Sequence, residues 1–170
     1  MTILHLEIPG PEHEAAVMDF RQEFLLTGER VSGGLGLELA DSYADWLQHK
    51  YIPHYGQVDE LVFLAFTDQN QLVGISDIRL QMNDFIRQYA GQIGYSVRPG
   101  CRGNGFATEI LRLTLLQAAA LPGFDRILLT CNEPNTASAK VIEKNGGILE
   151  EIIPHPGFPN VRRYWIQTAG

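Results

Sequence analysis

The sequence has few cysteines, a deficit of basic residues and no long apolar run. Its only cysteines, Cys101 and Cys131, argue against a disulfide framework. They have no CxxC spacing, so we expect inert thiols. No apolar run approaches the roughly 20 residues that cross a bilayer, and no basic segment followed by an apolar stretch marks a signal peptide. We therefore expect a cytoplasmic protein that makes no membrane interaction.

The charge balance is acidic. Thirteen Lys and Arg residues against 20 Asp and Glu residues give a net charge of −7. This field repels nucleic acid, whose binding depends on neutralising phosphates, so no nucleic-acid partner is expected. It favours cationic small molecules or basic peptides, although the same charge also serves simply to keep a protein soluble. The histidines have no HxxxH or HExxH spacing, so no metal site is expected; they are His5, His13, His49, His54 and His155.

Length and patterning predict one globular domain over residues 1–170. Apolar periodicity predicts helices at 11–26, 42–50, 106–120 and 135–144, and strands at 61–66, 72–78, 92–97, 126–131, 148–153 and 161–167. Three prolines within 154–159 predict a loop there, because proline cannot donate to a ladder. Strands that arrive first as a meander and then alternate with helices indicate an α/β protein with a mixed sheet and helices on its faces.

The segment between strand 92–97 and the helix at 106 has the features of an anion site. First-turn N–H groups of a helix lack partners and carry the positive end of its dipole. Gly103 and Gly105 allow the backbone to approach an anion, and Arg102 adds a planar cation. By itself the pattern also fits an ordinary tight turn. A GxxxxGK[ST] loop is absent and Thr108 occupies the third glycine position of GxGxxG, which excludes both nucleotide-binding motifs.

Two longer stretches resemble one known family. Arg102-Gly-Asn-Gly105-Phe-Ala107 matches the [Q/R]-x-x-G-x-[G/A] pattern of the GNAT superfamily of N-acetyltransferases, and 93–99 resembles the strand before it. The stretch Asn135 to Gly146 resembles the second family signature. The likeness spans about 60–150; within the superfamily it is greatest to a bacterial branch of predicted acetyltransferases and more distant to ribosomal-protein N-acetyltransferases.

The resemblance implies a fold and a cofactor. The fold is a mixed, mostly antiparallel sheet of six to seven strands, flanked by helices and splayed between the fourth and fifth strands. The cofactor is acetyl-CoA, with no metal. Asn135 would bond the pantetheine amide and Ser138 would face the same ligand, although a helix N-cap also explains both. The remaining implied coenzyme contacts are Tyr95, Ser96 and Val97 along the pantetheine, and Arg102, Gly103, Asn104, Gly105, Phe106 and Ala107 at the pyrophosphate.

The implied reaction is direct attack of a neutral primary amine, on a small molecule or peptide, at the thioester. Many family members protonate the leaving thiolate with a tyrosine at the position of Ile142. Ser138 is the favoured replacement here; Tyr95 or Tyr164 is an alternative, and a thiolate that leaves unaided is a third. Cys131 is not expected to carry the acyl group, because no histidine is close by in sequence and direct attack by the amine needs no nucleophile on the enzyme.

Several questions stay open at this point. Asp77 and Glu133 are candidate bases, although each also fits a surface carboxylate. The missing tyrosine supports a second reading, a non-catalytic acyl-CoA-binding module, and another phosphate ligand is a third. The acceptor would be selected by 25–55 and by 154–159, where His155 lies in the expected loop. The resemblance allows a homodimer, since family members are often dimers.

Overall fold

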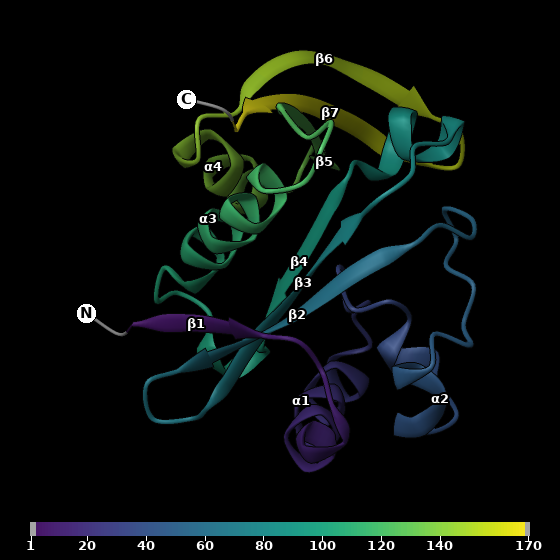
Figure 1. Cartoon of the computed structure of the whole chain (residues 1–170). Helices are drawn as coiled ribbons and strands as arrows, with labels where there is room; N and C mark the ends of the chain where they lie inside the picture. The colour runs from purple at the N-terminus through teal and green to yellow at the C-terminus, as the bar shows by residue number, and fades with distance from the viewer. Residues whose placement is uncertain (1–2, 169–170) are drawn as a thin grey trace.

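The computed structural model describes residues 3–168 and contains two antiparallel sheets, with orders β1-β2-β3-β4 and β5-β7-β6 (Figure 1). The strands are β1 (Leu4–Glu7), β2 (Glu60–Thr67), β3 (Leu72–Arg79), β4 (Ile93–Val97), β5 (Arg126–Asn132), β6 (Ile148–His155) and β7 (Phe158–Gln167). The helices are α1 (Glu14–Thr27), α2 (Tyr43–Leu47), α3 (Phe106–Ala119) and α4 (Thr136–Lys144), with short turns η1 (Pro11–His13), η2 (Leu37–Leu39), η3 (Ile86–Ala90) and η4 (Pro99–Cys101). The predicted fold class is confirmed.

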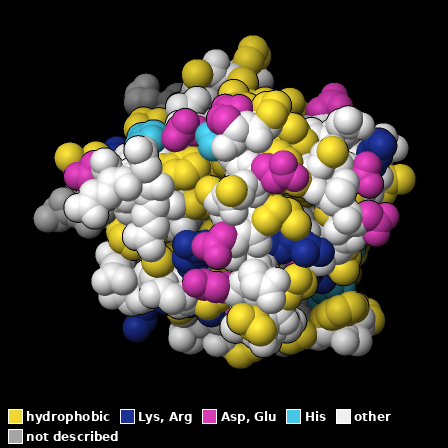
Figure 2. All heavy atoms as spheres, turned by 90° about the horizontal axis from the view of Figure 1, so that it is seen from below, with side chains coloured by type: hydrophobic (Ala, Val, Ile, Leu, Met, Phe, Trp, Pro, Cys, Tyr) yellow, Lys and Arg dark blue, Asp and Glu magenta, His cyan; other side chains and the backbone are white. Residues whose placement is uncertain are grey.

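The helices cover both faces of the first sheet. Val17, Phe20 and Phe24 recur on one side of α1 and are buried with α2 against β2 and β3. α3 packs on the opposite face, and α4 lies beside it next to the second sheet (Figure 1). On the outer face formed by α1 and α2, acidic, basic and apolar side chains are interspersed rather than gathered by kind (Figure 2).

The first and second sheets separate between β4 and β5. At their start the two strands still touch: Gln92 N donates to Leu128 O at 2.8 Å, and Leu128 N donates to Gln92 Oε1 at 2.8 Å. Further along no ladder joins the sheets within residues 3–168. On its other side β4 forms backbone hydrogen bonds with β3 at residues 92 and 98. Because the backbone groups of a strand point alternately to its two sides, the N–H groups of Ile93, Tyr95 and Val97 point toward the opening.

The segment 154–159 is not the loop that its prolines predict. β6 and β7 run through Pro154 and Pro159 and leave only a two-residue turn with Gly157 at φ +82°. β6 is an edge strand, and its register with β7 is irregular between Ile153 and His155. Proline is tolerated at such edge and bulge positions, because no ladder hydrogen bond is lost there.

One strand was not predicted at all. β1 spans four residues, too few for a clear alternation, and pairs with β2 in the register Leu4 to Thr67. The polar stretch that follows residue 83 likewise contains the π turn η3. No helix within residues 3–168 is long and apolar enough to cross a membrane.

Candidate active site

A cavity of about 950 Å³ occupies the opening between β4 and β5 and continues beneath the segment that joins α1 to α2. Ten of the eleven predicted coenzyme contacts line it: Tyr95, Ser96, Val97, Arg102, Gly103, Gly105, Phe106, Ala107, Asn135 and Ser138. The eleventh, Asn104, turns away and donates from Nδ2 to Cys101 O at 3.0 Å, which shapes the loop instead. The structure therefore brings residues from β4, α3 and α4 to one site.

The N-terminus of α3 is open toward this cavity. Its N-cap residue, Gly105, has φ +78°, and no side chain caps the helix. Gly103 also has positive φ, at +83°. An uncapped first turn leaves N–H groups free, and Phe106, Ala107 and Thr108 from that turn line the cavity. The arrangement suits an anion of the size of a phosphate.

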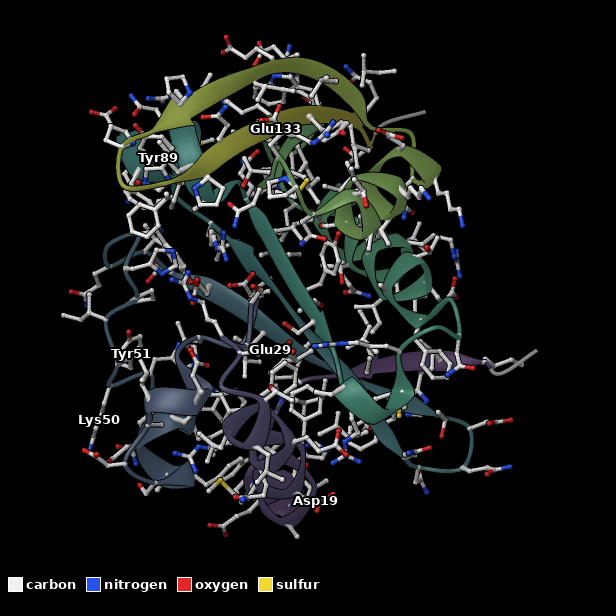
Figure 3. The ribbon with its side chains drawn as sticks, turned by 180° about the vertical axis from the view of Figure 1, so that it is seen from behind. Asp19, Glu29, Lys50, Tyr51, Tyr89 and Glu133 are labelled. Atoms are coloured by element: carbon white, nitrogen blue, oxygen red, sulfur yellow. The ribbon has the colours of Figure 1, made fainter. Side chains whose placement is uncertain are left out.

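Arg102 ties this loop to the segment after α1. Its Nη1 and Nη2 atoms donate to the two carboxylate oxygens of Glu29 at 3.2 and 2.7 Å. The hydrogen bonds from Arg102 lower the pKa of Glu29. Figure 3 shows Glu29 in the middle of the molecule, and both side chains line the cavity. The guanidinium is therefore positioned at the loop and partly neutralised.

Asn135 and Ser138 form a helix cap at the wall of the cavity. Asn135 is the N-cap of α4, and its Oδ1 accepts from Ser138 N at 3.1 Å. The N-cap explanation is therefore correct, and both residues also line the cavity.

The two candidate acids, Tyr95 and Ser138, lie together. Tyr95 Oη and Ser138 Oγ are 2.7 Å apart. Burial raises the pKa of Tyr95 to about 12, so the phenol stays protonated. The nearby Cys131 also lines the cavity, and burial raises the pKa of its thiol, which makes it a poor nucleophile.

Ile142 and Tyr164 do not reach this site. Both are fully buried in the core between α3, α4 and the second sheet. Tyr164 Oη donates to Glu143 Oε1 at 3.0 Å, away from the cavity wall. Of the candidate acids, only the Tyr95–Ser138 pair therefore lines the cavity.

Neither candidate base lines the cavity. Asp77 is fully buried and is no surface carboxylate: its Oδ1 accepts from Gly94 N at 2.7 Å, and Arg79 Nε lies 3.3 Å from Oδ2. Glu133 lies beside β7 (Figure 3), and its Oε1 accepts from Asn160 at 3.3 Å.

The far end of the cavity contains residues that sequence reasoning missed. Its wall includes His54, Tyr55, Arg79 and Tyr89. Burial, with Arg30 nearby, lowers the pKa of His54 to about 4, so this ring is neutral at pH 7. His54 and Tyr55 were expected near the acceptor only because they lie in the segment 25–55. No sequence pattern indicated Arg79 or Tyr89.

The β6–β7 hairpin supports this end of the cavity. The ring of Tyr89 stacks on His155 with centroids 3.8 Å apart, and His155 stacks on Phe158 at 4.5 Å. Figure 3 shows Tyr89 beside the hairpin tip. His155 thus packs behind Tyr89 and is not itself part of the wall.

The segment after α1 packs directly on β4. A Cβ added to Gly33 would lie 2.4 Å from Gly94 O, and Gly33 has φ +76°. We expect Gly33→Ala to lower the free energy of unfolding by at least about 2 kcal/mol, because both the contact and the dihedral oppose it. Gly28→Ala is the matched control, since Gly28 has φ +72° with nothing within 4 Å. Urea unfolding measures both; equal losses would contradict this packing.

Comparison with known proteins adds the family. The model of the GNAT acetyltransferase domain matches residues 14–148. No curated protein sequence matches the chain.

Solved structures share the fold. The ribosomal L7/L12 α-N-protein acetyltransferase RimL in complex with coenzyme A is 18% identical, with 98% of this chain and 95% of that one covered and a TM-score of 0.71. The Salmonella typhimurium acetyltransferase that modifies the N-terminal serine of L7/L12 is 18% identical, with 98% and 96% covered and a TM-score of 0.67. Spermidine N-acetyltransferase from Vibrio cholerae, in complex with CoA and spermine, is 18% identical, with 97% and 95% covered and a TM-score of 0.65.

Proposed function

The chain belongs to the GNAT acetyltransferase family, and from this we propose that it transfers an acetyl group from acetyl-CoA to a primary amine by direct attack of the amine on the thioester. The observation that carries the proposal is the open N-terminus of α3, which faces a cavity between two separating strands. A linear thioester with a phosphate-rich end fits that shape, with the phosphates at the helix and the arm along β4.

The coenzyme would be held by the predicted set of residues. Backbone N–H groups of 102–107 would bind the pyrophosphate, and Lys140 and Lys144 line the same cavity as further cations. The pantetheine arm would pair with the free edge of β4 at Tyr95, Ser96 and Val97. The Asn135 amide would meet the arm from the other side.

The reaction needs charge stabilisation and a proton for the leaving group. A β4 N–H that faces the opening, at Tyr95 or Val97, would bind the carbonyl oxygen as negative charge develops on it. The Tyr95–Ser138 pair would protonate the thiolate from the α4 side. This pair replaces the usual tyrosine, whose position is taken by the buried Ile142.

The acceptor is proposed as a small-molecule or peptide amine. Related structures are described as acting on spermidine or on the N-terminus of a ribosomal protein, and the net charge of −7 supports a cationic acceptor. A homo-oligomer, in the simplest case a homodimer, belongs to the same proposal; one related spermidine N-acetyltransferase is dodecameric. A cytoplasmic location is also proposed, because the acyl donor is an intracellular metabolite.

Coenzyme A should stabilise the protein strongly. At 100 times its dissociation constant a ligand that binds only the folded chain adds about 2.7 kcal/mol. For a domain of this size that corresponds to a melting temperature roughly 5–10 °C higher. Differential scanning fluorimetry with coenzyme A measures the shift, and phosphate alone is the control. No shift would remove the coenzyme from the proposal.

Turnover distinguishes the enzyme from the alternative, a non-catalytic acyl-CoA-binding module, which the absence of a tyrosine at position 142 favours. The protein is incubated with acetyl-CoA and a panel that includes spermidine, ethylamine and a peptide with a free N-terminal serine, and thiol release is followed. Transfer to any amine supports the enzyme. Tight coenzyme binding without transfer to any of them supports the module.

A further inference from the structure

Four polar side chains form a buried cluster behind the cavity. Tyr55 Oη donates to Glu60 Oε1 and lies 3.4 Å from Asp77 Oδ2. Glu60 in β2 stands directly opposite Arg79 in β3, and Arg79 Nε is 3.6 Å from Glu60 Oε1 and 3.3 Å from Asp77 Oδ2. The Arg79 guanidinium also lies over the Tyr55 ring, 4.2 Å from its centroid. Hydrogen bonding and charge therefore couple the four groups.

The cluster has two carboxyl groups for one cation. Asp77 accepts hydrogen bonds from Gly94 N and from Arg79. Glu60 has less support: its side chain is 1% exposed, and Oε2 has no partner within residues 3–168. Burial, followed by the charge of Asp77, raises the pKa of Glu60 to about 8. Glu60 can therefore exchange a proton near neutral pH.

Glu60 stands between two cavities. Tyr55 and Arg79 line the main cavity. Glu60 lines a second cavity of about 280 Å³ together with Trp46 and His49. The titratable and charged groups that interact with the Glu60 carboxyl are Tyr55, Asp77 and Arg79, and His49 lines the second cavity with Glu60.

The cluster adjoins the point where the strands begin to separate. Asp77 bonds Gly94, which lines the main cavity at the start of β4. The cluster lies on the face of the first sheet that α1 and α2 cover. Ser96 of β4 is on the same face, and its Oγ donates to Ser32 O at 2.6 Å. Tyr95 points to the opposite face and Ser138. An acceptor that enters beneath 28–36 would therefore meet the cluster, on the side away from the thiolate.

An amine acceptor has to lose a proton before it attacks, because an alkylammonium has a pKa of about 10.4. Other carboxylates that line the cavity are already bonded: Glu29 accepts from Arg102 and Glu38 accepts from Val31 N at 3.2 Å. We propose that Tyr55 and Glu60 relay the acceptor proton out of the main cavity to the second cavity. This inference rests on the proposed acetyl transfer.

The relay balances as follows. The acceptor N–H proton passes to Tyr55 Oη while the Tyr55 hydroxyl proton passes to ionised Glu60 Oε1. The freed nitrogen lone pair forms the C–N bond, the C–S bond breaks, and the thiolate takes its proton from the Tyr95–Ser138 pair. The nitrogen loses its second proton to water in the cavity as the amide forms, and water returns a proton to the pair. Glu60 then releases its proton to water through the second cavity. Because the relay needs ionised Glu60, the rate of transfer to an alkylamine should rise with pH through about 8.

Two small amines test the relay without knowledge of the natural acceptor. Ethylamine is protonated at pH 7.5 and needs a base, whereas hydroxylamine is already neutral and does not. We expect Glu60→Gln to lower kcat/KM for ethylamine by at least about 100-fold. Transfer to hydroxylamine and the dissociation constant for coenzyme A should stay within about threefold of wild type. The inflection of the ethylamine pH profile near 8 should also disappear.

The controls separate the possible failures. Asp59→Asn changes the exposed neighbouring carboxylate and should leave both rates unaltered. Tyr55→Phe removes the relay hydroxyl and should reproduce the selective loss, which covers the case in which Glu60→Gln does not fold. Equal effects on both amines, or an unchanged pH profile, would overturn the relay. A wild-type protein that binds coenzyme A and acetylates neither of these amines, nor spermidine or the peptide, would instead contradict the proposed function.

Discussion

Gly105→Glu should abolish coenzyme A binding and leave the fold intact. Gly105 is the N-cap of α3 at the cavity, where a pyrophosphate would take the place of a capping side chain. A glutamate there brings an anion and its bulk to the helix terminus and can cap the free N–H groups itself. We expect at least a 100-fold weaker affinity, equal to about 2.7 kcal/mol. Isothermal titration calorimetry with coenzyme A measures it.

The control for this substitution lies elsewhere in the chain. Gly123 has φ +82° against φ +78° for Gly105, and a Cβ at either position meets nothing within 4 Å. Gly123→Glu therefore carries the same backbone strain and the same charge outside the cavity. The two variants should lose similar stability, and only Gly105→Glu should lose the coenzyme. Unchanged affinity in Gly105→Glu would show that the pyrophosphate binds elsewhere.

The end of the cavity proposed for the coenzyme was predictable because its signals are local. Strand, glycine loop and helix follow one another within 92–120, and each has its own pattern: apolar run, glycines, then helical period. Residues close in sequence stay close in space, so the predicted contacts at 95–97 and 102–107 meet one cavity almost without exception.

The end proposed for the acceptor was not predictable, because it depends on the register in which strands pair. Glu60 and Arg79 become neighbours only when β2 and β3 pair in one register, and a shift of one residue would turn one of them to the opposite face. Asp77 fits a surface carboxylate by sequence, yet the same pairing buries it. The position of Tyr89 depends on its stacking against the β6–β7 hairpin, and the prolines of that hairpin predict a loop instead.

The first sheet separates the two proton transfers of the proposed reaction. Side chains alternate along β4, so Ser96 bonds the segment after α1 while Tyr95 bonds α4 on the other face. In the proposed mechanism, a base on the α1 face would take a proton from the amine nitrogen, and an acid on the α4 face would give a proton to the leaving sulfur. They would not exchange protons directly, since the thioester lies between them.

The acid side gives the second large effect, on turnover rather than on binding. Ser138→Ala and Tyr95→Phe each remove one hydroxyl of the pair at 2.7 Å. We expect each to lower kcat by about 10- to 100-fold with an alkylamine acceptor, because a general acid contributes on the order of 10²–10⁴ and the remaining hydroxyl or water replaces part of it. Stopped-flow measurement of thiol release under single-turnover conditions isolates this step.

Tyr164→Phe is the matched control, because it removes a buried phenol that bonds Glu143 outside the cavity. It should leave turnover unaltered and affect only stability. The Tyr95→Phe/Ser138→Ala double variant should be little slower than the slower single one, since the two hydroxyls act as one donor and such effects are not additive. Fully multiplicative losses would instead mean that Tyr95 and Ser138 act separately. Wild-type rates in both single variants would indicate that the thiolate leaves without an acid, which its stability near neutral pH allows.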